Sequence, residues 1–149
     1  MAELVDGEKP ANEYGENDYR LAAATLLVHT ASIDGSISEV ERASLHDLLK
    51  HRFSLDDAGT YKLVEEATEA DASATDLYQF TSKLNRTMDD EARARLVEMM
   101  WQIVYADGAV TEFEDNLIWR AADLLNVSRE QRIALRARVA GAGKGGESE

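Results

Sequence analysis

Two short stretches of the chain carry oxygen-bearing side chains at the same spacing. The first contains Asp34 and Glu41, and the second contains Asp107 and Glu114. In each stretch a glycine follows the aspartate, and a hydroxyl residue stands three positions before the glutamate. Hard divalent cations take several oxygen ligands, and gathered carboxylates repel one another unless a cation lies between them. The spacing therefore favours a divalent-cation site built from these four carboxylates.

The two stretches belong to a longer internal repeat. Residues 26–41 align with residues 99–114, and the Asp-Gly pair, two glutamates, the capping hydroxyl and the aliphatic residue after the loop coincide. After a slip of one residue, positions 53–56 match positions 125–128. The duplicated unit is a helix, an Asp-Gly loop, a second helix and the start of a third. An approximate twofold axis between the copies would bring the loops together, with Glu39 and Glu112 as further candidate ligands.

Each Asp-Gly segment corresponds to the second half of an EF-hand loop, from its fifth to its twelfth position. The first half of that loop is not present. Its first and third positions lack carboxylates and hold Thr30 and Ser32 in one copy and Ile103 and Tyr105 in the other. A complete EF-hand is therefore excluded, and a looser site remains.

The same residues also suit a purely structural role. Glycine ends a helix in the left-handed conformation without a Cβ penalty, which Gly35 and Gly108 would do. Ser38 and Thr111 would then cap the following helix, and the glutamate three positions later would return the hydrogen bond of a capping box. In this alternative the Asp-Gly loops are turns that bind no metal.

The capping signal also predicts where helices begin. A hydroxyl residue is followed three positions later by an acid or amide at Ser38, Ser54, Ser73, Thr87, Thr111 and Ser128. No stretch shows the alternation of a strand, so the sequence predicts an all-α fold. Apolar stripes at helical spacing predict its core, with Ala22, Leu26, His29 and Ile33 on one face of the first helix. We expect about seven helices at residues 18–33, 38–52, 55–71, 74–86, 88–106, 112–125 and 129–139.

The ends of the chain differ in composition from its middle. Residues 1–17 are polar and acidic, which predicts a flexible lead-in. Residues 141–149 contain four glycines, which predicts a disordered tail. The folded domain is therefore expected at residues 18–140. The chain has no cysteine, which excludes a disulfide framework and a thiolate zinc site.

The charge narrows the choice of partners and compartment. With 29 acidic and 16 basic residues the formal net charge is −13, which disfavours nucleic acid and favours cations or basic protein surfaces. The longest apolar run lies within residues 21–33 and is too short to insert across a bilayer. Residues 1–9 lack the features of a signal peptide, so we expect a cytoplasmic protein.

Nothing in the sequence predicts an enzyme. The chain has three histidines, of which His29 is expected to be a structurally satisfied residue on an apolar helix face. It lacks phosphate-binding glycine loops, nucleophile elbows and zinc-protease motifs, and no histidine has the Glu-x-x-His spacing of a di-iron bundle. An unusual metal-dependent hydrolase is the enzymatic alternative. The arginine-rich last helix predicts either a solvated face or one side of a bipolar docking surface.

The doubled Asp-Gly-x-Ile/Val-Ser/Thr-x-x-Glu motif resembles the tellurite-resistance TerB family. The resemblance covers about residues 19–139, in an acidic, cysteine-free chain. It implies a compact, internally duplicated helical domain, with Asp34, Glu41, Asp107 and Glu114 as the metal site. It also implies a role in resistance to tellurite or other stress, as an adaptor in membrane-associated metal-sensing complexes.

Taken with the residues, the resemblance leads us to expect a non-enzymatic accessory or adaptor protein. This protein would bind protein partners and a divalent cation whose identity the sequence does not give. The alternative is a metal-free helical interaction module.

Overall fold

The computed structural model describes residues 19–148 except positions 34, 36, 75, 107 and 109, and describes side chains as far as residue 141. Over these residues the chain forms seven helices and no strand, which confirms the predicted all-α class. The predicted lead-in at residues 1–17 lies outside the described residues. The helices are α2 (Tyr19–Ala31), α3 (Glu39–Arg52), α4 (Asp57–Ala72), α5 (Tyr78–Thr87), α6 (Asp90–Ala106), α7 (Glu112–Leu124) and α8 (Arg129–Ser148).

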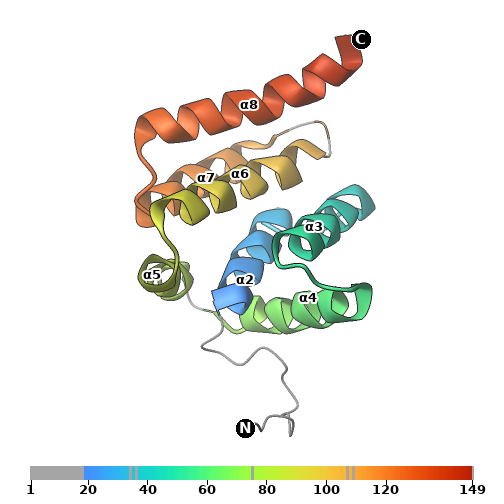
Figure 1. Ribbon diagram of the computed structural model, residues 1–149, viewed down its shortest axis with the longest axis vertical. Coiled ribbons are helices and arrows are strands. Elements are labelled where there is room, and N and C mark those ends of the chain that lie inside the picture. The colour runs from blue at the N-terminus through green and yellow to red at the C-terminus, as the bar shows by residue number, and fades with distance from the viewer. Residues whose placement is uncertain are drawn as a thin grey trace, which may run out of the picture.

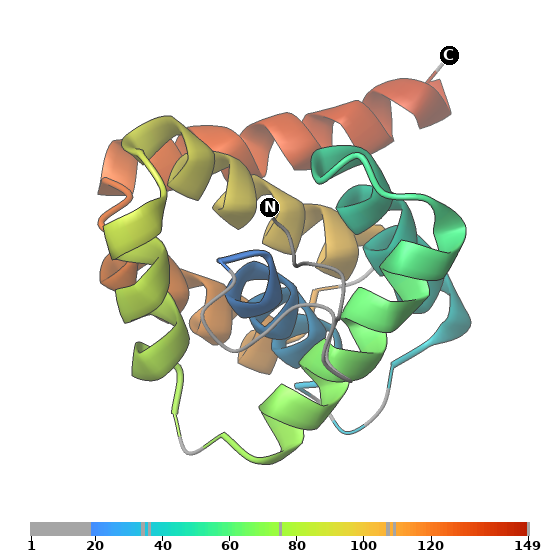
Figure 2. The same cartoon turned by 60° about the horizontal axis from the view of Figure 1, so that its bottom comes forward.

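Helix α2 is the centre of the fold. It contacts α3, α4, α5, α6 and α7, and Figure 2 shows these helices arranged around it. Ten of its thirteen residues are buried, so burial extends well beyond the single face that we predicted. Its buried hydroxyls are satisfied within the helix, because Thr25 and Thr30 donate to the carbonyl oxygens four residues earlier at 2.6 and 2.8 Å. An almost wholly apolar helix is stable only when other helices enclose it.

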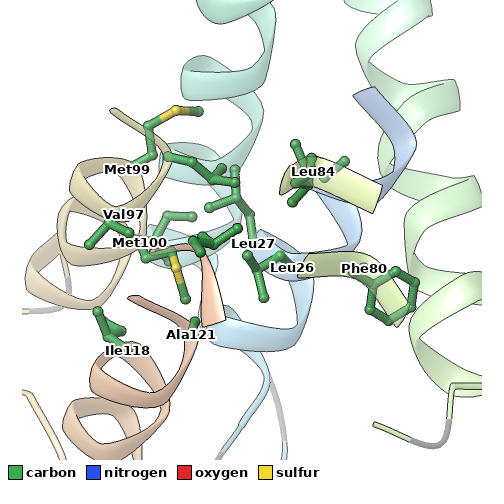
Figure 3. Close-up of a cluster of buried hydrophobic side chains, with 14 of the residues drawn as sticks. Leu26, Leu27, Phe80, Leu84, Val97, Met99, Met100, Ile118 and Ala121 are labelled. Carbon is green, nitrogen blue, oxygen red and sulfur yellow. The ribbon is translucent and has the colours of Figure 1, made fainter. Parts of the chain in front are cut away.

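The hydrophobic core surrounds α2 on several sides. Leu26 and Leu27 of α2 pack with side chains from α5, α6 and α7, as Figure 3 shows. The stripe predicted on α6 is in this core, and Met100, Ile103 and Val104 are fully buried there. The core thus holds the C-terminal end of α2 and the N-terminal part of α7 in fixed positions, which is what any site between them requires.

The predicted helix starts are confirmed where glutamate or glutamine follows the hydroxyl, and wrong where aspartate does. Capping boxes form at Ser38 and Thr111, and Ser128 bonds reciprocally with Gln131. Ser54 instead has a left-handed backbone with φ of 54°. Aspartates cap α4 and the start of α6, since Asp56 accepts from the Gly59 amide at 2.7 Å and Asp89 from the Ala92 amide at 2.9 Å. A short carboxylate caps well itself and competes for the role.

Helix α8 is longer than we predicted. It continues through Ser148, whereas we expected it to end at residue 139 and a disordered tail to begin at residue 141. Each glycine costs a helix about 1 kcal/mol relative to alanine, but glycine keeps the backbone N–H that proline lacks. No proline follows Pro10, so no residue in this stretch blocks helical hydrogen bonding.

Arginines fasten α8 onto the rest of the fold. The guanidinium of Arg132 lies 5.0 Å from the Trp119 ring centroid and 2.6 Å from an Asp123 oxygen. Arg136 stacks on Trp101 in the same way, with its guanidinium 4.7 Å from the ring centroid. Arg132 and Arg136 therefore make contacts within the molecule, while the prediction that the arginines of α8 form one side of a docking surface stays a prediction. None of the described helices combines the length and apolar character needed to cross a bilayer.

The anchor between α6 and α8 is sensitive to acid. Burial alone would raise the pKa of the Glu98 carboxyl, but hydrogen bonds from Arg138 and Arg95 outweigh it and hold that pKa below its usual range. A lowered folded-state pKa stabilises the fold above the unfolded value of about 4.3, and this contribution is lost as pH falls through the folded pKa. We expect Glu98→Gln to lower the free energy of unfolding by about 1 kcal/mol at pH 7 and by much less at pH 3.

Urea denaturation of wild type and variant at both pH values measures this difference. Glu91→Gln is the matched control. Glu91 is on the same helix, but its side chain is exposed and its ion pair with Arg95 is long, at 3.7 Å. That control should leave stability nearly unchanged. An equal loss of unfolding free energy in both variants at pH 7 would show that the ion pairs of Glu98 stabilise the fold no more than the exposed pair of Glu91 does.

Candidate functional site

The first Asp-Gly loop joins α2 to α3 through a left-handed glycine and a capping box. Gly35 has φ of +115°, a conformation that side chains rarely adopt. Its amide bonds to the Ser32 carbonyl at 3.0 Å. The Ser38 hydroxyl accepts from the Glu41 amide at 3.0 Å, and Glu41 Oε1 accepts from the Ser38 amide at 3.1 Å. The loop therefore has the local geometry of the structural role described above.

The second loop repeats this geometry between α6 and α7. Gly108 has φ of +90°, and its amide bonds to the Tyr105 carbonyl at 3.0 Å. Thr111 and Glu114 exchange the same pair of hydrogen bonds, at 3.1 and 2.9 Å. The similarity extends to the far ends of α3 and α7, where Ser54 and Asn126 both have positive φ. The two loops thus have the same local geometry, while the internal duplication and the twofold axis between the copies stay predictions.

The predicted cation ligands occupy different environments. The side chains of Glu41 and Glu114 are buried, with residue exposures of 3% and 2%. Glu39 and Glu112 are exposed at the first positions of their helices. Asp34 and Asp107 lie outside the described residues, so the four-carboxylate site is neither assembled nor excluded. The described residues contain no group of three or more His, Asp or Glu side chains that could hold a metal by themselves.

An open pocket lies beside the two loops and has a volume of about 430 Å³. Its apolar lining comes from the residue before the first Asp-Gly pair, from α5 and its N-cap, and from α7: Ile33, Leu77, Phe80, Phe113 and Leu117. Its polar lining is His29, Asp71, Asp76, Asn116 and Arg120. Ile33 immediately precedes the first Asp-Gly pair, and Phe113 follows the second loop in the first turn of α7. The structure therefore brings the residues that flank both loops to one pocket.

A histidine–aspartate pair forms part of the pocket wall. His29 Nδ1 lies 2.8 Å from Asp71 Oδ1, and the side chains are 33% and 19% exposed. An ionised carboxylate can only accept, so Nδ1 carries the proton and Nε2 is an acceptor in the neutral ring. The sequence predicted a satisfied His29 but gave no signal that linked it to Asp71, which is 42 residues away.

Among the described residues, the pair has no nucleophile beside it. The geometry resembles the histidine–carboxylate pair of a catalytic triad. Such a triad also needs a nucleophile within hydrogen-bond reach of the other ring nitrogen, here His29 Nε2. None of the described residues that line the pocket is Ser, Thr, Cys or Lys. The described lining therefore combines apolar side chains with a few polar ones, which is typical of a binding pocket.

Comparison with protein-family models identifies a family for this chain. The model described as tellurite resistance protein TerB matches residues 20–137, which cover most of the chain and all the loops described above. Comparison with curated proteins and with solved structures gives no significant match.

The tautomers of two histidines test the pocket geometry. We expect neutral His29 to carry its proton on Nδ1, because Asp71 accepts there. His46 is the matched control, since its Nε2 lies 3.2 Å from Asp57 Oδ1 and should carry the proton instead. Long-range ¹H–¹⁵N spectra near pH 8 distinguish the two forms. Asp71→Ala should release His29 from the Nδ1–H form, and an Nε2–H tautomer of His29 in wild type would contradict the geometry.

Proposed function

We propose that this chain, which belongs to the TerB family of tellurite-resistance proteins, is a non-enzymatic accessory protein that binds a protein partner and a divalent cation. The cation would be held by Asp34, Glu41, Asp107 and Glu114. The setting would be the cytoplasm, with the partner in a membrane-associated complex that responds to tellurite or other stress. The net charge of −13 makes nucleic acid an unfavourable partner.

One observation carries the cation proposal: the burial of the same glutamate in both repeats. Removing a carboxylate from water is costly unless hydrogen bonds or a cation compensate. Each buried glutamate is the third residue of the helix that follows an Asp-Gly loop, and the sequence places a second carboxylate, the aspartate, in that loop. A cation between them would relieve both the burial and the mutual repulsion of the acids. Carboxylate oxygens are also the ligands that Mg²⁺ and Ca²⁺ prefer.

A specific observation favours the second candidate, a metal-free interaction module. In both repeats Oε1 of the glutamate already accepts from the N-cap amide, so capping alone gives this side chain a role. The left-handed glycines likewise serve as turns. Under this alternative the partner still binds, and only the cation is absent. The two candidates therefore differ in a property that can be measured directly.

The first experiment asks whether any divalent ion stabilises the protein. A ligand that binds only the folded state adds about 2.7 kcal/mol at a hundredfold excess over its Kd. We expect the melting temperature of wild type to rise with one of Ca²⁺, Mg²⁺, Mn²⁺ or Zn²⁺. Asp34→Asn combined with Asp107→Asn should abolish the rise. If no ion shifts wild type at millimolar concentration, the metal-free module is correct.

The second experiment separates capping from coordination at the buried glutamates. Glutamine keeps an acceptor oxygen, so Glu41→Gln with Glu114→Gln should cost only part of the roughly 0.5–2 kcal/mol of a helix cap when chelator is present. A hard cation needs the charge, so the same variant should lose most of its metal-dependent stabilisation.

A control variant removes equal charge away from the loops. Glu65 and Glu69 are exposed on α4, and Glu65→Gln with Glu69→Gln should respond to metal as wild type does. Equal responses of all three proteins would show that Glu41 and Glu114 are caps and not ligands.

A further inference from the structure

The pocket beside the loops has an apolar floor and an exposed aromatic rim. Leu77, Phe80 and Leu117 belong to the core yet line the pocket, so each turns some surface towards it. The Phe113 side chain stands at the rim and is 69% exposed. A single exposed apolar residue is ordinary, but one that continues the apolar wall of a cavity extends a binding surface. The volume of about 430 Å³ falls within the range of roughly 300–1,000 Å³ for binding pockets.

Acidic and basic side chains lie on opposite sides of the pocket. Asp71 and Asp76 come from the end of α4 and the connection to α5, whereas Arg120 comes from α7. Asp76 accepts from the Tyr78 amide at 2.8 Å and forms no ion pair with any described residue. Arg120 likewise forms no ion pair within the described part of the chain. A cation is therefore favoured on the α4–α5 side and opposed on the α7 side.

We infer that this pocket receives a partner segment that inserts an apolar side chain against Phe80, Phe113 and Leu117. A Lys or Arg next to that anchor faces Asp76 and Asp71. On the other side of the pocket, Arg120 donates hydrogen bonds to the backbone carbonyl oxygens of the segment. The inference rests on the proposed function in that it names the chemistry of its protein partner, and the acidic chain as a whole attracts basic segments to the surface.

The internal repeat provides a matched control for the anchor contact. Val40 occupies the second position of α3, as Phe113 does in α7, and it is 51% exposed. It lies within the equivalent capping box after the other Asp-Gly loop but does not line this pocket. Phe113→Ser and Val40→Ser therefore make similar changes at equivalent exposed positions, and both variants should fold. Of the two variants, only Phe113→Ser removes a side chain that lines the pocket.

The test uses the full-length protein labelled with ¹⁵N and three synthetic 12-residue peptides, all in chelator. One peptide carries leucines and lysines, one replaces each lysine by glutamate, and one replaces each leucine by serine. The leucine–lysine peptide should bind with shifts centred on the amides of Phe113, Leu117 and Leu77. Phe113→Ser should weaken binding at least tenfold and Asp76→Asn about threefold. Val40→Ser should leave binding unchanged.

Several outcomes would overturn the inference. Tighter binding of the glutamate peptide would mean that Arg120 and His29 select an anion. Equal binding of the serine peptide would remove the apolar anchor, and shifts away from the pocket or no binding by any peptide would remove the site. Self-association of the free protein that Phe113→Ser abolishes would identify a second copy as the occupant. Because chelator removes the cation, these results do not depend on the metal titrations, and either experiment can fail while the other succeeds.

Discussion

The burial of helix α2 determines how the other helices are arranged. Leucines, alanines and threonines occupy most of its circumference, and the threonine hydroxyls are satisfied internally, so ten of its thirteen residues are buried without needing water. The alanines let neighbouring helices approach closely. Five helices must pack around it to remove its apolar surface from solvent, and their positions follow from that requirement. Both the Asp-Gly loop at its end and the wall containing His29 are placed by this central helix.

Local signals predicted the fold well where a residue's preference did not depend on distant contacts. The capping boxes at Ser38 and Thr111 close on residues three positions away, so the sequence contains both partners. Signals ending in aspartate failed because a nearby aspartate can cap the helix itself, as Asp56 does. The burial of α2 beyond its most regular stripe could not be predicted from that stripe. That burial depends on how many neighbouring helices the rest of the chain supplies.

The candidate site was predictable only in part. The glutamates and glycines of the two loops take the local geometry that the repeat indicates, since that geometry is set by adjacent residues. The hydrogen bond between His29 and Asp71 joins α2 to the end of α4, and no spacing pattern in the sequence predicts it. Nor does charge pattern reveal that Arg132 and Arg136 are stacked on tryptophans. Such contacts depend on tertiary packing and become visible only when the helices are placed.

The attachment of α8 differs in kind from the packing of the other helices. Among its described side chains, Leu135 alone belongs to the core cluster, while Arg132, Arg136 and Arg138 make its polar and stacking contacts. Undocking this helix breaks these polar and stacking contacts, whereas unfolding the helices around α2 exposes the apolar core and carries a large heat-capacity change. Temperature and ionic strength act differently on the two processes. Raising the ionic strength therefore weakens the attachment of the last helix more than it weakens the apolar packing around α2.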